Sequence, residues 1–528
     1  MPATVWSRGM DLGRTLGVGS TIARSFIVSF ERPDRLPRAL TAMAPWGSSV
    51  AGLLAGAAAR YPDRNAVTDD GGSITYRAMW QRTLSVAASL QTDGIGPGSK
   101  VGLLARNHRG FVEALGAIAA VGADAILLNT GFAGPQLADV VDAEQIDTIF
   151  HDDEFTPIVA AAGASLTIDE ADLERRAVGG GAVEPTRQSG RVVILTSGTT
   201  GRPKGAARES GPSALEGVAA ILDRIPLRVG DVQVVAAPLF HAWGLSHLLL
   251  GIARCATSVV SRRFDPVRTV HAIADEGADV LVVVPVMLSR ILQASETTEV
   301  RLPSLRVIAA SGSAISGQLV IDVLERFGPV LYNLYGSTEV AAATIATPDD
   351  LAQHPTTAGR PVRWVDVVVV DRQGNRLPDG SSGRIFVGGA MKFDGYTNGD
   401  DKERLGGLVA TGDVGYFGDG LLFVEGRDDD MIVSGGENVF PSEVEELLHR
   451  HPDVADVVVV GVPDDEFGQV LAAFVVKQRG SRLSAQRVKD HVKSELARHK
   501  VPRYVQFVDE LPRNATGKLL RRQLSVDV

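Results

Sequence analysis

The chain is poor in cysteine, in long apolar stretches and in net positive charge. Its single cysteine, Cys255, excludes an intramolecular disulfide and a zinc-finger framework, and it agrees with residence in the cytosol. No uninterrupted apolar stretch reaches the roughly 18 residues that a membrane-spanning helix needs. The net charge of -10 argues against general nucleic-acid binding, which favours a basic domain. A nucleotide remains a possible ligand, because a local cluster of cations and amides can hold phosphates on an acidic protein.

The N-terminal 40 residues differ in composition from the rest of the chain. They carry six arginines against three acidic residues, and the charges interrupt any apolar core that a signal peptide would need. Several apolar residues fall on one helical face: Ile22, Ala23, Phe26, Ile27 and Phe30. Two interpretations stay open. This helix lies at a membrane surface as a peripheral contact, or it packs on its own domain, which we prefer.

The remaining chain alternates between strand and helix patterns. With 528 residues it is too long for one ordinary core, so at least two domains are expected. Short apolar runs separated by helical stretches predict βαβ units and a mostly parallel sheet. We expect the acidic, glycine-rich stretch 169–190 to be a loop. The predicted strands are 101–104, 125–128, 192–195, 232–237, 280–284 and 305–309, a helix is predicted over 111–121, and 365–371 and 383–387 are expected to be shorter antiparallel strands.

The last hundred residues predict a separate α+β unit. A helix is expected to begin at Pro441, with Ser442 accepting from the first-turn amides. Strands are predicted over 454–460 and 472–476, and a helix over 485–498. About 100 residues are enough for an independent small domain.

A loop rich in glycine and hydroxyl groups follows the apolar strand 192–195. It reads Thr196-Ser-Gly-Thr-Thr-Gly-Arg-Pro-Lys-Gly205. Glycines let the backbone approach a polyphosphate, hydroxyls offer hydrogen bonds and Lys204 adds a cation. The pattern G-x-x-x-x-G-K-[ST] of kinases and GTPases is absent, because Arg202 and Pro203 separate Gly201 from Lys204. The loop is therefore a candidate phosphate site, with a surface loop that binds nothing as the alternative.

Seven further motifs follow this loop in order. They are PLFHAWG (238–244), ASGSA (310–314), YGSTE (335–339), TGD (411–413), GRDDD (426–430), SGGEN (434–438) and LPRNATGK (511–518). Together with the loop they resemble the adenylate-forming, AMP-binding ligase superfamily, from about Trp46 to the C-terminus. The segment that begins at Gly426 is most similar to acyl-CoA and aryl-CoA ligases, and RNHRGF (106–111) resembles fatty-acyl-CoA ligases of actinobacterial type.

The resemblance implies the fold and the domain boundaries. It implies an α/β protein with mixed, mostly parallel sheets, a small antiparallel barrel-like part and a C-terminal α+β domain. The expected parts are an N-terminal extension (1–45), a large AMP-binding domain (46–428) and a small mobile domain (429–528) that turns about a hinge at Asp429.

The resemblance also implies a reaction in two steps. A carboxylic acid reacts with ATP to give an acyl-adenylate and pyrophosphate, and coenzyme A then displaces AMP. Both steps move charge among phosphate oxygens, so cations and donors held in place matter more than a protein nucleophile. Lys518 is implied to bridge the carboxylate and the α-phosphate. A homodimer is a further expectation.

The site residues that the resemblance implies fall into five groups. Catalytic residues are Lys518, His241 and Glu339, and the last is expected to hold Mg²⁺ together with Thr196. ATP and AMP are expected to contact Thr196, Ser197, Gly198, Thr199, Thr200, Gly201, Lys204, Ser311, Gly312, Ser313, Ala314, Tyr335, Gly336, Ser337, Thr338, Asp413 and Arg427. The hinge is Asp429, coenzyme A passes Ser434, Gly435 and Gly436, and the acyl pocket includes Trp243 and Val340.

Taken singly, most of these residues have a simpler interpretation. A lysine near the chain end is usually just solvated. Glu339 could be an acid at the start of a helix near Ser337. His241 and Trp243 could be core residues, and Asp413 and Arg427 could be an ordinary turn aspartate and a surface arginine.

Small residues after Glu339 predict an apolar acid as substrate. Val340 to Ala343 make room, and no fixed charge is evident there for an amino group, so a fatty acid of medium or long chain is preferred to an amino acid. The chain has Phe467 where several relatives have tryptophan, so the nucleotide end of coenzyme A is expected to be held differently. Loading of an acyl carrier protein instead of coenzyme A is the main alternative, and a phosphotransferase is a weaker one.

Overall fold

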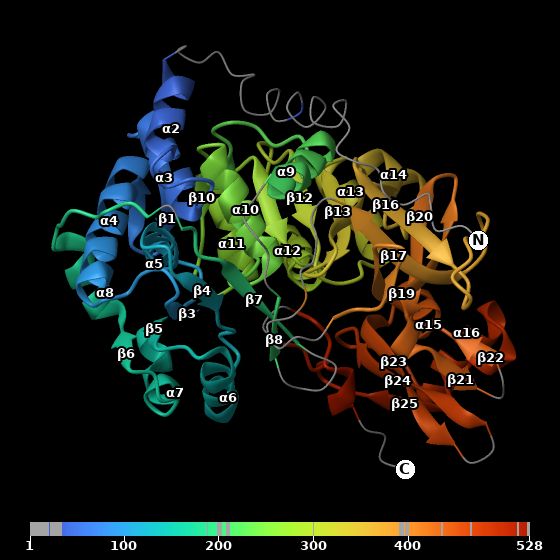
Figure 1. The fold of residues 1–528 in the computed structure, drawn as a ribbon. Helices are drawn as coiled ribbons and strands as arrows, with labels where there is room; N and C mark the ends of the chain where they lie inside the picture. The colour runs from blue at the N-terminus through green and yellow to red at the C-terminus, as the bar shows by residue number, and fades with distance from the viewer. Residues whose placement is uncertain are drawn as a thin grey trace. The chain divides into compact units, whose positions relative to one another are not determined.

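A computed structural model describes residues 21, 34–186, 188–197, 203–206, 212–298, 300–389, 395, 401–434, 437–464, 467–514 and 517–524 (Figure 1). The predicted amphipathic segment 22–30 lies outside these residues. The chain divides into two compact units. The first comprises 1–311, 336–342 and 389–402, and the second comprises 312–335, 343–388 and 403–528. None of the described helices combines the length and the apolar character that crossing a membrane requires.

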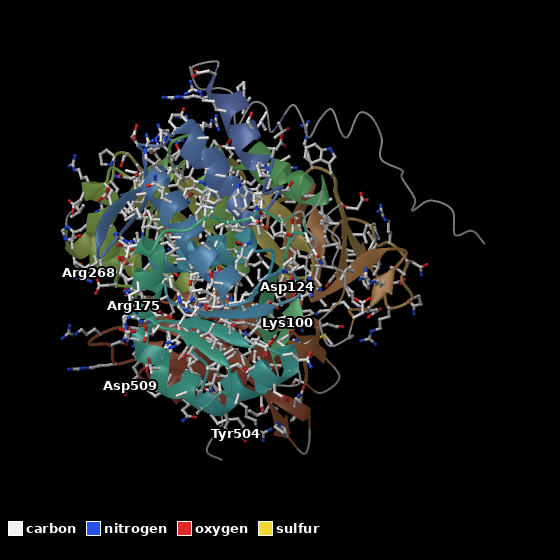
Figure 2. The ribbon with its side chains drawn as sticks, turned by 60° about the vertical axis from the view of Figure 1, so that its left-hand side comes forward. Lys100, Asp124, Arg175, Arg268, Tyr504 and Asp509 are labelled. Atoms are coloured by element: carbon white, nitrogen blue, oxygen red, sulfur yellow. The ribbon has the colours of Figure 1, made fainter. Side chains whose placement is uncertain are left out.

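The first unit contains a six-stranded sheet with the order β6-β5-β3-β4-β7-β8. All neighbours are parallel except β7 and β8, which form an antiparallel pair at one edge. Lys100 and Asp124, which face each other at the starts of β3 and β4, are labelled in Figure 2. The strands are β3 (Lys100–Leu104), β4 (Asp124–Leu127), β5 (Thr148–His151), β6 (Leu166–Ile168), β7 (Val192–Ser197) and β8 (Pro203–Ala206).

Helices connect and cover these strands. α5 contacts β3 and β4, while α6 and α7 contribute Leu137, Val140 and Val159 to an apolar core with Ile126 and Ile149 of the sheet. Continuous apolar strands are typical of parallel sheets that are covered by helices. The helices are α2 (Arg35–Met43), α3 (Val50–Arg60), α4 (Tyr76–Thr92), α5 (Arg109–Ala120), α6 (Gly134–Glu144), α7 (Thr156–Ala160) and α8 (Glu170–Val178).

A second parallel set of strands in the first unit follows the order β12-β11-β9-β10-β1, and β2 pairs antiparallel with β1. The strands are β1 (Asn65–Asp69), β2 (Gly72–Thr75), β9 (Val232–Val235), β10 (Thr257–Val259), β11 (Val280–Val283) and β12 (Val307–Ala310). The helices of this part are α9 (Pro212–Arg224), α10 (Ala242–Ala253), α11 (Pro266–Asp275) and α12 (Pro285–Thr297).

The second unit contains an antiparallel sheet of five strands. β16, β17, β19 and β18 follow one another, and β20 pairs with β19. The strands are β16 (Val365–Val370), β17 (Gly383–Gly389), β18 (Arg404–Leu405), β19 (Leu408–Gly418) and β20 (Leu421–Arg427). Before them come α13 (Gly317–Phe327), β13 (Leu331–Ser337), β14 (Ala341–Ala346), α14 (Pro348–Gln353) and β15 (Arg360–Pro361), of which β13 and β14 have residues in both units.

The C-terminal part of the second unit is an α+β arrangement with two apolar cores. α15 (Pro441–His449) and α16 (Ala485–Glu495) pack on one core with β23, and the other holds Phe474 and Leu511. Figure 1 shows β23, β24 and β25 side by side here. The strands are β21 (Ile432–Ser434), β22 (Glu437–Val439), β23 (Val454–Asp464), β24 (Gly468–Lys477) and β25 (Tyr504–Phe507).

Most predicted elements are confirmed within a few residues, and three details are wrong. Stretch 169–190 is not all loop, because α8 occupies Glu170–Val178 and the Asp169 side chain caps it by accepting from Asp172 N at 2.8 Å. Ser442 does not cap α15, since its hydroxyl donates to Glu425 O instead. No helix begins near Ser337, where a turn over 338–340 separates two strands.

Candidate active site

Two neighbouring strands and the end of a third bring three predicted residues together in the second unit. β19 and β20 pair with Asp413 opposite Arg427, and Arg427 Nη1 lies 3.9 Å from Asp413 Oδ1. Tyr335 of β13 donates a hydrogen bond of 2.6 Å from its hydroxyl to Asp413 Oδ2. The Thr411 hydroxyl accepts from Asp413 N–H at 3.0 Å, which steadies the backbone beneath the carboxylate. Residues from three separate motifs thus form one cluster.

The electrostatics of this cluster keep the tyrosine protonated. Burial, and then the nearby charge of Asp413, raise the pKa of Tyr335 well above its usual value. The phenol therefore donates at neutral pH, and Asp413 acts as acceptor. A carboxylate accepts at two oxygens, which suits a vicinal diol such as a ribose, and an aromatic face beside it suits a base.

The predicted phosphate loop begins and ends in the β7–β8 hairpin of the first unit. Thr196 lies opposite Lys204 in the register, and Ser197 lies opposite Pro203. Residues 198–202, which include the predicted Gly198, Thr199, Thr200 and Gly201, are outside the described residues. The hairpin therefore brings the two ends of the motif together at a sheet edge.

Glu339 lies in the turn between β13 and β14, in the first unit. Its backbone N–H donates to Ser337 Oγ at 3.2 Å, and Val340 N–H donates to the same oxygen at 3.3 Å. The predicted contact Ser337 ends β13, Thr338 belongs to this turn, and Val340 is buried. A Cβ on Gly336 would lie 1.7 Å from Ala341 O, so only glycine fits at that position.

The predicted adenine loop follows β12. Ser311 is buried at the end of the strand, whereas Gly312, Ser313 and Ala314 are exposed. Gly312 has φ +98°, in the region that favours glycine. Ser316 then caps α13 by accepting from Leu319 N at 3.3 Å. The loop thus offers exposed backbone between a buried strand and a capped helix.

The PLFHAWG segment of the first unit is held by a residue that the motifs did not indicate. The Asn107 side chain donates to Ala237 O at 3.0 Å and accepts from Leu239 N at 2.8 Å, so it clamps the segment before His241. Trp243 donates from Nε1 to Val283 O at 3.1 Å. The RNHRGF similarity was the one signal that could have pointed to Asn107.

A buried histidine, His247, lies on α10, and a partly buried one, His241, lies just before it. His241 precedes the helix, its Nε2 has no hydrogen-bond partner among the described residues, and burial lowers its pKa to about 4. His247 packs edge-on against Trp243 with ring centroids 4.3 Å apart. Burial, and then the charge of Arg254, lower the pKa of His247 to about 3. Both imidazoles are therefore neutral at pH 7, so His241 cannot supply a positive charge there.

These histidines predict a loss of stability in mild acid. An unfolded chain takes up protons near pH 6.5, whereas the folded protein does so only near pH 4 and pH 3. Their contribution to the free energy of unfolding is therefore complete above pH 6.5. Between pH 6.5 and the pKa of the folded form, it falls by about 1.4 kcal/mol per pH unit for each histidine. Urea unfolding at pH 7 and pH 5 measures this slope. The variant His247→Phe should have a shallower slope between these values, and an unchanged slope would contradict the assignment.

The hinge and tail residues lie in the second unit. Asp429 is in a short 3-10 turn, Asp428–Asp430, between β20 and β21. Ser434 is buried at the end of β21, while the predicted Gly435 and Gly436 lie outside the described residues. Lys518 is exposed, and its backbone N–H donates to Asn514 Oδ1 at 2.9 Å.

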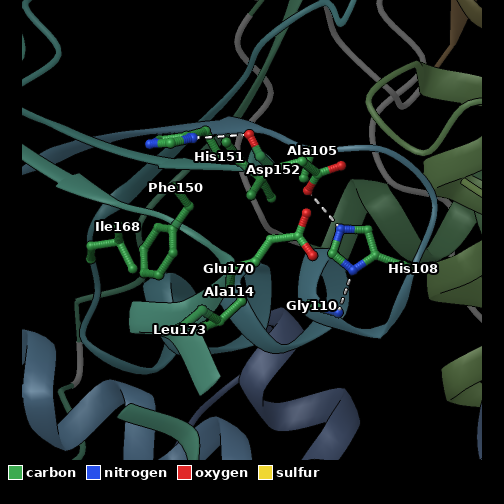
Figure 3. Close-up of a pocket in the computed structure, with 11 residues that line it drawn as sticks. Ala105, His108, Gly110, Ala114, Phe150, His151, Asp152, Ile168, Glu170 and Leu173 are labelled. Atoms are coloured by element: carbon green, nitrogen blue, oxygen red, sulfur yellow. Dashed lines mark hydrogen bonds and ion pairs between the residues drawn. The ribbon is translucent and has the colours of Figure 1, made fainter. Parts of the chain in front are cut away.

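A small, mostly apolar pocket in the first unit is lined in part by His108 and Gly110 of the RNHRGF segment, and it lies outside the predicted site (Figure 3). His108 accepts at Nδ1 from Gly110 N at 3.1 Å, so its Nε2 donates to Asp152 Oδ1 at 2.7 Å. Asp152 Oδ2 also accepts from Arg106 N at 3.0 Å. The pocket volume of about 10 Å³ leaves room for at most about one water, which favours a structural role for the histidine–aspartate pair.

Comparison with known proteins identifies the family. Residues 54–397 match the AMP-binding enzyme family, and residues 443–518 match the AMP-binding enzyme C-terminal domain. The 2-succinylbenzoate–CoA ligase of Bacillus cereus is 32% identical over 473 residues, which cover 88% of this chain and 95% of that protein. The indoleacetate–CoA ligase of Aromatoleum aromaticum is 33% identical over 503 residues, which cover 90% and 96%.

A solved structure extends the similarity to the fold. The o-succinylbenzoate CoA synthetase of Bacillus subtilis, in complex with its acyl-adenylate OSB-AMP, has a TM-score of 0.81 and 28% identity, and covers 90% of this chain and 98% of that one. The fold class predicted from the sequence is confirmed. The chain belongs to the AMP-binding enzyme family and is an AMP-forming acid–thiol ligase.

Proposed function

We propose that the protein activates an apolar carboxylic acid, in the first place a fatty acid, with ATP and joins it to coenzyme A. A carboxylate oxygen attacks the α-phosphorus, the bond to pyrophosphate breaks and an acyl-adenylate forms. The thiol sulfur then attacks the acyl carbon, and AMP leaves. The observation that carries this proposal is the cluster of Tyr335, Asp413 and Arg427, because it supplies an aromatic face, a double acceptor and a cation for a nucleoside.

The loop between β7 and β8 is proposed to contact the phosphates of ATP. The proposed contacts run from Thr196 through Lys204, and the hairpin register that sets these two residues opposite each other supports this assignment. Among the described residues, no three histidine, cysteine, aspartate or glutamate side chains gather into a metal site. Mg²⁺ commonly binds through one or two carboxylates plus substrate phosphates. Glu339 with Thr196 suits that chemistry, and the ion would draw charge from the phosphate oxygens.

The remaining roles follow the order of the two steps. Lys518 offsets the repulsion between the carboxylate and the α-phosphate in the first step. His241, as a neutral ring, shapes the carboxylate pocket beside Trp243. The part of the chain after Asp429 then turns about this residue, and coenzyme A passes along Ser434 and the two glycines after it. The boundary of the mobile domain at 429 is part of the proposal.

The preference for a fatty acid rests on small apolar residues near the turn that holds Glu339. Val340 and Ala342 are buried, and neither carries a charge that could pair with an amino group. An aryl acid is a second candidate. Two relatives favour it, because they are named as ligases of 2-succinylbenzoate and of indoleacetate.

A substrate panel tests the proposal. We expect hydroxylamine-trapped adenylation with ATP to be fastest with fatty acids, slower with aryl acids and at background with amino acids. Fastest turnover of an aryl acid would replace the first candidate by the second, and preference for an amino acid would contradict both. Release of ADP in place of AMP and pyrophosphate would overturn the reaction itself. Coenzyme A assayed against an acyl carrier protein separates the two thiol acceptors.

A further inference from the structure

The segment that carries Lys518 is a closed turn. Asn514 N–H donates to Lys518 O at 2.9 Å, and Lys518 N–H donates to Asn514 Oδ1 at 2.9 Å. Leu520 N–H donates to Pro512 O at 2.8 Å, which joins the two arms of the turn below this pair. The backbone of Lys518 is therefore held although its side chain is exposed.

Apolar residues anchor both arms of the turn. Leu511 before it belongs to the core that contains Val458 and Phe474, and Leu519 after it is partly buried against that core. Burial of these side chains fixes the turn to the sheet of the C-terminal part. Apolar contacts alone, however, do not set the direction in which the chain leaves Gly517 for Lys518.

Arg513 supplies that direction with two hydrogen bonds. Its Nη1 donates to Gly517 O at 3.0 Å, and its Nη2 donates to Asp456 Oδ2 at 2.8 Å. Asp456 in turn accepts at Oδ1 from Val457 N–H at 2.9 Å, so the carboxylate is itself fixed to β23. The planar guanidinium thus joins the strand to the peptide group that precedes Lys518.

We propose that Arg513, held by Asp456, is a positioning residue for Lys518; the proposal rests on the function proposed above. A lysine side chain has a flexible four-carbon stem, so the protein can set its reach mainly through the backbone at its base. Gly517 has φ +77°, which turns the chain sharply at the carbonyl that Arg513 holds. If this carbonyl were released, the backbone at Lys518 could move and carry the ammonium group with it. A misplacement of a reacting group by about 1 Å can cost a hundredfold in rate.

The test compares the two half-reactions in the full-length enzyme. We expect Arg513→Ala to lower kcat for adenylation, measured as pyrophosphate release without coenzyme A, by about tenfold to a hundredfold. The KM for ATP and the rate of thioester formation from supplied acyl-adenylate should stay within about twofold, because neither uses Lys518 in the proposed scheme. Arg513→Lys keeps the charge beside Asp456 but loses the second hydrogen bond, so an intermediate loss is expected.

Two controls separate positioning from general bracing. Arg77 and Asp63 form an exposed pair of 2.9 Å in the first unit, and Arg77→Ala should leave both half-reactions unchanged. In a Lys518→Ala background, Arg513→Ala should cost nothing further, since it acts only through the lysine. A further loss in that background, or equal loss in both half-reactions, would overturn the inference.

The outcomes also distinguish this inference from the function on which it rests. Normal adenylation by Lys518→Ala would remove the proposed role of the lysine. A large loss of adenylation rate in Lys518→Ala, together with normal rates in Arg513→Ala and Arg513→Lys, would remove the positioning role alone. If Arg513→Ala does not fold, Arg513→Lys and Asp456→Asn decide the matter, because both keep the size of the side chain; normal adenylation by both would overturn the inference.

Discussion

Lys518→Ala is expected to lower the rate of acyl-adenylate formation by about a hundredfold to a thousandfold, the size of effect seen when one preorganised donor is removed. The carboxylate and the α-phosphate repel each other as they approach, and the exposed ammonium is the cation proposed to offset that repulsion. Pyrophosphate release in single-turnover experiments measures the step. Thioester formation from supplied acyl-adenylate should be nearly unaffected, since the repulsion is gone once the adenylate exists.

A matched substitution serves as control for this prediction. Lys500 also lies in the C-terminal part, where it pairs with Glu443 at 2.6 Å. Lys500→Ala should therefore keep both rates. A similar loss with both lysines would show that general charge, and not the tail ammonium, is responsible.

Asp429→Pro is expected to slow thioester formation by about a hundredfold and adenylation by at most a few fold, since conformational steps gate many enzymes. Asp429 lies in the three-residue turn between two strands, Asp428–Asp430, with Arg427 before it and Met431 after it in extended conformations. Proline restricts φ to about −65° and removes the N–H. If the C-terminal part must rotate about this residue between the two half-reactions, proline would hold it in the arrangement for the first one.

The control for the hinge is Asp429→Ala, which leaves the backbone free to rotate. It should support both half-reactions, with thioester formation measured by rapid quench. Equal loss of both steps in the proline variant would count against a hinge at this position and would suggest misfolding, which a thermal melt detects.

Much of the fold was predictable because parallel strands are continuous apolar runs. Val280–Val283 and Val232–Val235 are clear from composition alone, since they are short, β-branched and bounded by helical stretches. α8 was missed because its surroundings are rich in glycine and acid, which hides the helical repeat of a nine-residue segment. The misassigned Ser442 shows the same limit, because a hydroxyl near a helix start can bond to either backbone group and the sequence does not distinguish them.

The candidate site was predictable only for residues that belong to the sequence motifs. Tyr335, Asp413 and Arg427 were selected from the sequence, but the 2.6 Å hydrogen bond between two of them joins residues 78 positions apart. Asn107 was missed because its partners are backbone groups of the segment before His241, and backbone partners leave no trace in composition. Arg513 was hidden for the same reason, since one of its two partners is a carbonyl.

The tight turn after β13 has a consequence for redesign of the acid preference. A library that varies the proposed acyl pocket can sample Val340, whose side chain is buried. Position 336 must be left untouched, because even a methyl group there would overlap the carbonyl oxygen of Ala341. Mutants for new substrates should therefore vary position 340 and keep glycine at position 336, four residues before it.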